Sequence, residues 1–158
     1  MKSKLKNFED VRRFLDAVPF INSGGCGVAA LAMYRWIKTN MPEYKDKVVF
    51  HFFHRDSDSY QHNKRLIKNN QYNDNNIQIP SHIAIEIKGI TGKTPVDSNS
   101  AVSIHRYGYV VKIKSEDVLI KAINNFRSWN FFFYRKDNVP LIARKLKIDL
   151  SDIVTEIG

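Results

Sequence analysis

The fold of this chain is decided by residues 22–37, which read NSGGCGVAALAMYRWI. Two glycines lead into Cys26, the only cysteine of the chain, and a mostly apolar run follows it. This pattern predicts a sharp turn and then a helix from about Cys26 to Thr39. The first turn of a helix carries unpaired N–H groups and a partial positive charge, and such an environment favours a thiolate. The segment therefore predicts a cysteine placed for chemistry, with a small, buried and inert cysteine as the alternative.

Apolar spacing predicts further helices and strands on both sides of this segment. The predicted helices cover residues 8–18 with Asn7 as N-cap, about 26–39, 115–125, and a last turn within 151–157. The predicted strands cover residues 48–54, 83–88, 107–113 and the aromatic run 129–134. Residues 55–76 are polar, and we expect a long loop there with one short helix near 62–68.

The order of these elements indicates the fold class. Helices come first, a run of strands follows, and one helix is inserted late, which is typical of an α+β fold. We expect a single domain over residues 1–158, in which an antiparallel sheet packs on the helix that begins at Cys26.

The net charge and the apolar composition limit the classes of partner that we expect for this chain. The formal net charge of the chain is +9, which suits an acidic protein or peptide substrate, with nucleic acid as the second candidate. Because the lysines are scattered along the sequence, the preferred interpretation is solvating charge spread over the surface. No apolar run is long enough to cross a membrane, and the basic segment 1–7 lacks the apolar stretch of a secretory signal, so no membrane partner is expected. A single cysteine suits a reducing compartment, so we expect a cytoplasmic protein. The oligomeric state does not follow from the sequence.

A histidine and an aspartate follow Cys26 in an order that suits a nucleophilic cysteine. His82 opens a predicted strand, and Asp97 lies 15 residues further on. A strand, a turn and a returning strand would place these two side chains together, so that Asp97 orients the imidazole and the imidazole acts as base. Asn99 is the substitute for the orienting role, and a simple turn cap is the alternative for Asp97. The other histidines compete less well with His82; they are His51, His54, His62 and His105.

The sequence also offers candidate oxyanion donors and candidate metal ligands. The N–H of Cys26 and the side-chain amide of Asn22 are the predicted oxyanion donors, and Gly25 and Gly27 would let a substrate carbonyl approach closely. The pair His51-x-x-His54, with Asp56 and Asp58 nearby, has ligand chemistry, but the end of a plain strand is the preferred interpretation. We therefore expect no metal and no cofactor.

Three motifs together resemble the papain-like cysteine peptidase superfamily, in the style of its compact bacterial and phage members, both peptidase-like and transglutaminase-like. The motifs are Gly24-Gly25-Cys26-Gly27 at a helix start, His82-Ile83-Ala84-Ile85-Glu86-Ile87, and Val96-Asp97-Ser98. The resemblance spans about residues 22–100 and implies a papain-like fold with a central helix that begins at the cysteine. It implies Cys26 as nucleophile, His82 as base and Asp97 as orienting residue. The superfamily often has a glutamine near the place of Asn22, so this chain departs from the pattern there.

The sequence thus favours a cysteine-dependent hydrolase or acyltransferase that acts on an amide, isopeptide or thioester carbonyl, encoded by a phage or mobile element. The alternative is a basic binding protein on a peptidase-like scaffold, with the aromatic run 129–134 and its flanking Arg127, Arg135 and Lys136 against nucleic acid. A third interpretation is an interaction module whose glycines serve only the turn.

Overall fold

The structure is a computed structural model that describes residues 5–125 and 138–154. Its helices and strands, in chain order, are α1 (Phe8–Asp16), α2 (Cys26–Asn40), the 3-10 helix η1 (Pro42–Lys47), β1 (Val48–His54), α3 (Ser57–Lys68), β2 (His82–Ile87), the 3-10 helix η2 (Ile104–Arg106), β3 (Tyr109–Ile113), α4 (Glu116–Asn125) and α5 (Asn138–Leu146). The predicted aromatic strand 129–134 and its flanking basic residues lie outside the described residues. Within the two described ranges, no helix has the length and apolar character needed to cross a bilayer.

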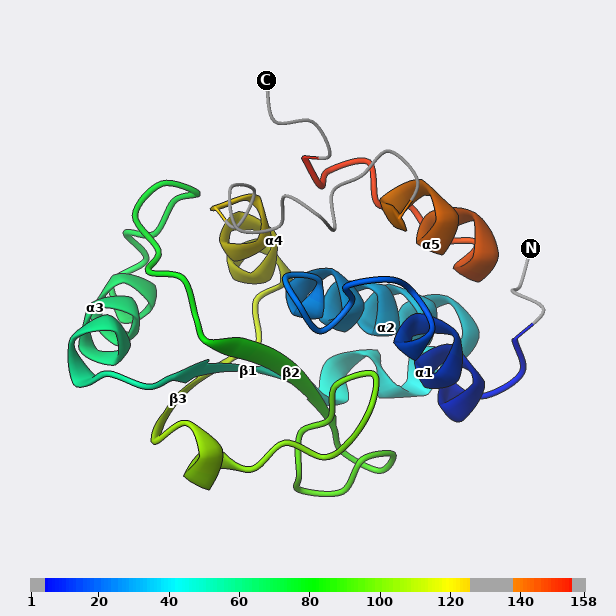
Figure 1. Ribbon diagram of the computed structural model, residues 1–158, viewed down its shortest axis with the longest axis horizontal. Coiled ribbons are helices and arrows are strands. Elements are labelled where there is room, and N and C mark those ends of the chain that lie inside the picture. The colour runs from blue at the N-terminus through cyan, green and yellow to red at the C-terminus, as the bar shows by residue number, and fades with distance from the viewer. Residues whose placement is uncertain (1–4, 126–137, 155–158) are drawn as a thin grey trace.

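Among the described residues, the sheet has three antiparallel strands in the order β2-β1-β3. Phe50 in the central strand pairs with Ile85 of β2 and with Ile113 of β3. Figure 1 shows α1, α2, α4 and α5 on one side of the sheet, and the segment between β2 and β3 on the other. The predicted α+β class with an antiparallel sheet is therefore confirmed, whereas the papain-like fold stays a prediction.

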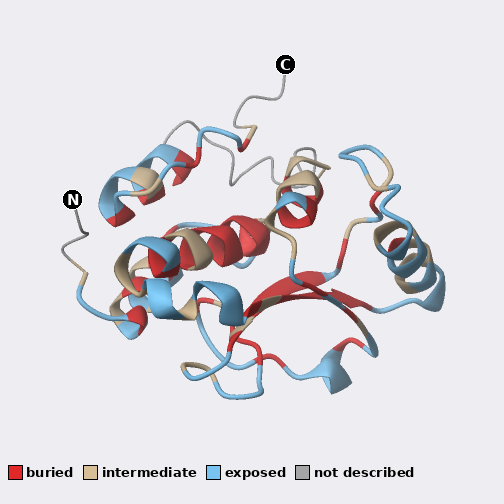
Figure 2. Ribbon diagram, turned by 180° about the vertical axis from the view of Figure 1, so that it is seen from behind, coloured by how far each residue is buried: buried red, intermediate tan, exposed pale blue. Residues whose placement is uncertain are grey.

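The helix that begins at Cys26 is the centre of the core. Residues Val28 to Met33 are each at most 1% exposed, and so are Trp36 and Ile37. In Figure 2, α2 is coloured mostly as buried, and the exposed helix surfaces face outward around it. A helix that is apolar on nearly all sides needs neighbours on all sides, which explains its place between the sheet and the other helices.

Gly27 brings α2 close to its neighbours. A Cβ atom at this position would lie 2.8 Å from Cγ1 of Ile123 in α4 and 3.2 Å from Cδ1 of Ile83 in β2. Because only glycine allows this approach, Gly27 sets how closely the first turn of α2 packs on β2 and α4.

Helix starts follow local capping chemistry. Asn7 caps α1 as predicted, and its Oδ1 accepts the N–H of Asp10 at 2.9 Å. Ser115 caps α4 through the N–H of Val118 at 3.3 Å. In both cases a side-chain oxygen satisfies one N–H of the first turn.

The structure changes two predictions for polar segments. The short helix expected near 62–68 is present but longer, because α3 already starts at Ser57, where the Asp56 carboxylate accepts the N–H of Ser59 at 2.8 Å. The one buried residue of this helix is the polar Asn63, so its apolar pattern is weak. Figure 2 colours most of the helix as exposed or intermediate. In the tail, α5 forms over Asn138–Leu146, and the described part of 151–157, up to residue 154, is a turn.

Candidate active site

A cleft of about 490 Å³ opens where α2 and β2 begin and β1 has just ended. The residues that line it are Asn22, Ser23, Gly24, Cys26, Arg55, Ile79, Pro80, Ser81 and His82. Two of the three predicted catalytic residues, 56 positions apart in the sequence, therefore share one cavity.

His82 is held in place by packing. As the first residue of β2 it pairs with Phe53 of β1, and its side chain is 9% exposed. Its imidazole stacks on the ring of Tyr107, with centroids 5.9 Å apart and planes inclined by 12°. Tyr107 stacks in turn on Phe53 at 5.1 Å. The imidazole therefore rests against a wall of aromatic rings, which limits its rotation.

Asp97 reaches His82 by the predicted strand, turn and return. Val96 forms an antiparallel bridge with Ile85 of β2, which brings the next residue beside the start of β2. Oδ2 of Asp97 lies 2.9 Å from Nε2 of His82. The other oxygen, Oδ1, accepts the N–H groups of Asn99 and Ser100, each at 2.8 Å. Asp97 is thus a turn cap and a histidine partner together.

The contacts of His82 and Asp97 determine the charge that each of the two side chains carries. Burial alone would lower the pKa of His82, but the hydrogen bond to Asp97 and the hydrogen bonding and charge of Cys26 outweigh it and raise this pKa to about 9. Burial would raise the pKa of Asp97, but the His82 hydrogen bond and the N–H groups of Ser100 and Asn99 hold it below its usual value. At neutral pH the pair is therefore an imidazolium and a carboxylate.

Cys26 lies at the first position of α2, directly after the N-cap residue Gly25. The first intrahelical bond joins the N–H of Ala29 to the carbonyl of Gly25 at 2.9 Å. N–H groups before that point have no acceptor within the helix, so they are suited to an oxyanion at the cleft. Cys26 is 7% exposed, and it lines the cleft and interacts with the His82 imidazole.

No family model, curated protein or solved structure matches this chain. The chemistry of the cleft is therefore inferred from its own geometry.

The predicted oxyanion and substrate residues lie in different settings. Asn22 lines the cleft, and its amide donates to Ser98 Oγ at 3.0 Å. Asn99 is beside Asp97, but its amide points to Asp16 at 3.5 Å, so Asp97 is the residue that contacts His82. Gly25 precedes Cys26 directly, whereas Gly27 packs against the core side chains described above.

Three of the four competing histidines have another partner for the imidazole, and the fourth, His105, is exposed and does not line the cleft. Nε2 of His51 lies 2.8 Å from Glu86, and Nε2 of His54 lies 3.2 Å from the amide of Asn63. Burial lowers the pKa of both histidines. Because residues three apart on a strand point to opposite faces, these two cannot share a metal ion. Nε2 of His62 lies 2.7 Å from the carbonyl of Asn76, and in the described part of the chain no cluster of three potential ligands forms.

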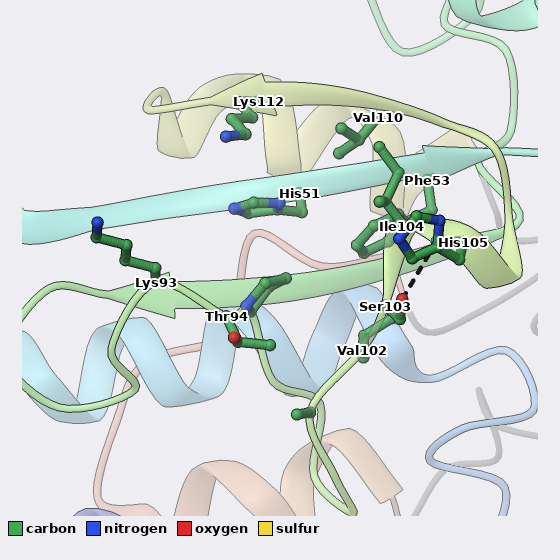
Figure 3. Close-up of a pocket in the computed structure, with 12 residues that line it drawn as sticks. His51, Phe53, Lys93, Thr94, Val102, Ser103, Ile104, His105, Val110 and Lys112 are labelled. Atoms are coloured by element: carbon green, nitrogen blue, oxygen red, sulfur yellow. Dashed lines mark hydrogen bonds between the residues drawn. The ribbon is translucent and has the colours of Figure 1, made fainter.

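A second cavity, of about 410 Å³, lies on the face of the sheet that is opposite the helix α2 (Figure 3). His51 and Phe53 point into it from β1, and Lys112 and Val110 flank it from β3. None of its lining residues lines the cleft at Cys26, so the two cavities are separate.

Two residues of the site were not predicted from the sequence. Tyr107, expected only as the start of a strand, supports the His82 ring. Arg55, expected in a loop, lines the cleft, and its guanidinium lies 5.3 Å from the centre of the Tyr107 ring. No local motif marks either residue, because their positions depend on how the segment between β2 and β3 folds back on β1.

Proposed function

We propose that this protein is a cysteine-dependent hydrolase or acyltransferase that acts on an amide, isopeptide or thioester carbonyl. One observation carries the proposal: a single buried imidazole, that of His82, is bound to the carboxylate of Asp97 and interacts with Cys26 in one cleft. Such an arrangement of nucleophile, base and orienting acid suits acyl transfer. The order of the three residues is also the one that the resemblance to papain-like peptidases implies.

The first half of the reaction forms an acyl-enzyme. The Cys26 thiolate attacks the carbonyl carbon, and the carbonyl electron pair moves onto the oxygen. N–H groups of the first turn of α2 stabilise that oxyanion. The His82 imidazolium then gives its proton to the leaving nitrogen or sulfur as the bond to carbon breaks. Because Nε2 of His82 faces Asp97, the proton to be transferred is the one on Nδ1.

The second half releases the acyl group. Water or an amine attacks the thioester carbon, and the now neutral His82 accepts the proton of that nucleophile. The thiolate leaves and the starting pair of charges is restored. Water as acceptor gives hydrolysis, and an amine gives acyl transfer.

Acylation by p-nitrophenyl acetate tests this function. We expect intact-mass analysis to show one acetyl group on Cys26 early in the reaction, and the label to be lost as the ester is turned over. Cys26→Ala should abolish the label, and His82→Gln should slow both its gain and its loss. His105→Gln, at an exposed histidine outside the cleft, is the matched control. Acetylation that is spread over lysines and is equal in the wild type and Cys26→Ala would overturn the proposal.

A further inference from the structure

The cleft at Cys26 is lined by cationic side chains and by no carboxylate of the described residues. The nine described residues that line it include an arginine and the His82 imidazolium but no aspartate or glutamate. Asp97 is close by, but both of its oxygens are engaged, one by His82 and the other by backbone N–H groups. Among the described residues, no carboxylate therefore lines the cleft to repel an anionic substrate.

Arg55 carries a permanent positive charge in this cleft, because a guanidinium does not lose its proton in a protein. It is exposed and follows directly on β1, and its guanidinium lies over the Tyr107 ring. Stacking occupies the face of a guanidinium and leaves the N–H donors at its edge for a carboxylate. Because Tyr107 also stacks on His82, one ring positions both Arg55 and the catalytic imidazole.

The described arginines differ in their partners. Arg35 is bound by Glu116 at 3.2 Å and by Asp152 at 2.7 Å, and Arg12 is bound by Glu9 at 3.1 Å. Within residues 5–125 and 138–154, no carboxylate of the protein lies within ion-pair distance of Arg55. Its charge is therefore available to a ligand, and it lines the same cavity as the nucleophile.

We propose that Arg55 forms an anion subsite beside Cys26, and that the substrate carries a carboxylate near the carbonyl that is attacked. This inference rests on the proposed function and adds the substrate class to it. The carboxylate is either an acidic side chain or a chain terminus, since Arg55 recognises the same group in both. The overall charge of +9 draws acidic molecules toward the protein, and Arg55 selects among them at the site.

Two alkylating reagents of similar size test the subsite. Iodoacetate carries a carboxylate and iodoacetamide does not, and both transfer their carbon to the Cys26 sulfur with release of iodide. The measured quantity is the rate constant for iodoacetate divided by the rate constant for iodoacetamide. This ratio cancels changes in the reactivity of the thiol itself. We expect Arg55→Gln to lower this ratio by about two- to fivefold, as suits one exposed ion pair, and the difference from wild type to shrink in 0.5 M salt.

Arg106 provides the matched control. Its guanidinium also lies over Tyr107, at 5.8 Å, but it does not line the cleft. Arg106→Gln removes the same charge from the same ring and should leave the ratio unchanged. An equal fall in both variants would show a general surface field, and no fall in Arg55→Gln would show no subsite; either result overturns the inference.

Failure of the inference is distinguishable from failure of the proposed function. If Cys26 is not activated, His82→Gln leaves the iodoacetamide rate unchanged, whatever Arg55 does. Protection of Cys26 from iodoacetamide then separates the two carboxylate sources. Protection by N-acetyl-aspartate amide supports a side-chain carboxylate, and protection by N-acetyl-alanine supports a chain terminus. Equal protection by the neutral N-acetyl-alanine amide would count against charge recognition.

Discussion

The carboxylate of Asp97 binds His82 with one oxygen and its own turn with the other. Oδ2 lies 2.9 Å from Nε2 of His82, and Oδ1 accepts the N–H groups of Asn99 and Ser100. One side chain therefore closes the turn after Val96 and orients the imidazole. Because the two oxygens have separate partners, substitutions at this position can separate the effect on the imidazole from the effect on the turn.

Asp97→Asn should keep the fold and lose the charge. The amide oxygen can still accept the backbone N–H groups, but the neutral side chain no longer stabilises an imidazolium. We expect the pKa of His82 to fall from about 9 toward its ordinary range, as followed by NMR titration of the imidazole ring. Asp97→Ala also loses the hydrogen bonds to the turn. Its unfolding free energy, measured in urea, should be about 1–3 kcal/mol lower than that of Asp97→Asn. A His82 pKa that stays near 9 in Asp97→Asn would contradict the assignment.

The raised pKa of His82 makes stability depend on pH. A pKa that is raised from 6.5 in the unfolded chain to about 9 in the folded protein adds stability that is fully present below pH 6.5 and is lost as pH rises through 9. The shift corresponds to about 3 kcal/mol. We expect the difference in unfolding free energy between wild type and His82→Gln to shrink by about that amount between pH 6 and pH 10. His105→Gln is the control, and a difference that does not change over this range would contradict the raised pKa.

The lowered pKa of Asp97 makes the stability of the fold depend on pH in the acid range. Its contribution is present above the unfolded value of 3.8 and is lost as pH falls through the lower folded value. Acid unfolding of Asp97→Asn should therefore depend less on pH below about 4 than that of the wild type. The measurement is the acid transition followed by circular dichroism, and identical slopes in the two proteins would contradict the prediction.

Gly27→Ala should strain the packing of α2, the helix that begins at Cys26. The added Cβ would lie 2.8 Å from Cγ1 of Ile123, and this cost, about 1–3 kcal/mol, exceeds the helix propensity gained, at most about 1 kcal/mol. We expect a lower unfolding free energy and slower alkylation of Cys26, because the first turn of α2 moves.

A double-mutant cycle isolates this contact. Ile123→Ala removes the Cγ1 atom that the new Cβ would meet, so Gly27→Ala should cost less in that background than in the wild type. An equal cost in both backgrounds would show that the close approach of α2 to α4 is not the cause.

The aromatic ring of Tyr107, and not its hydroxyl group, should stabilise the fold and position the His82 imidazole. Tyr107→Phe keeps the surface that stacks on His82 and on Phe53, and it should stay within about 1 kcal/mol of the wild type. Tyr107→Ala removes that wall and should cost about 3 kcal/mol, with a broadened or shifted His82 ring signal in NMR. A sharp and unchanged His82 signal in Tyr107→Ala would show that the ring does not position the imidazole.

The parts of the site that sequence reasoning found are those with short-range causes. Glycines before an apolar run place Cys26 at a helix start, and the strand, turn and return from His82 to Asp97 needs only fifteen residues. The bridge between Ile85 and Val96 and the 2.9 Å contact of His82 with Asp97 follow from that local geometry.

The parts that it missed have long-range causes. Only the second half of α3, near 62–68, is predicted from the sequence. Its full length depends on Asn63, whose amide bonds to His54 and to the backbone of Gln78, and a buried asparagine gives no apolar periodicity. Tyr107 and Arg55 meet only because the chain after β2 crosses the end of β1. Such contacts depend on tertiary packing, which no local spacing expresses.

The pH profile of Cys26 alkylation by iodoacetamide tests the central claim most directly. An ordinary thiol with a pKa near 8.5 is about 1% ionised at pH 6.5, so a thiolate paired with the His82 imidazolium should react up to about 100-fold faster there. We expect fast labelling at pH 6.5 in the wild type and the slow profile of an ordinary thiol in His82→Gln. Slow labelling at pH 6.5 in both proteins, rising only above pH 8, would contradict the claim that Cys26 and His82 form a catalytic pair.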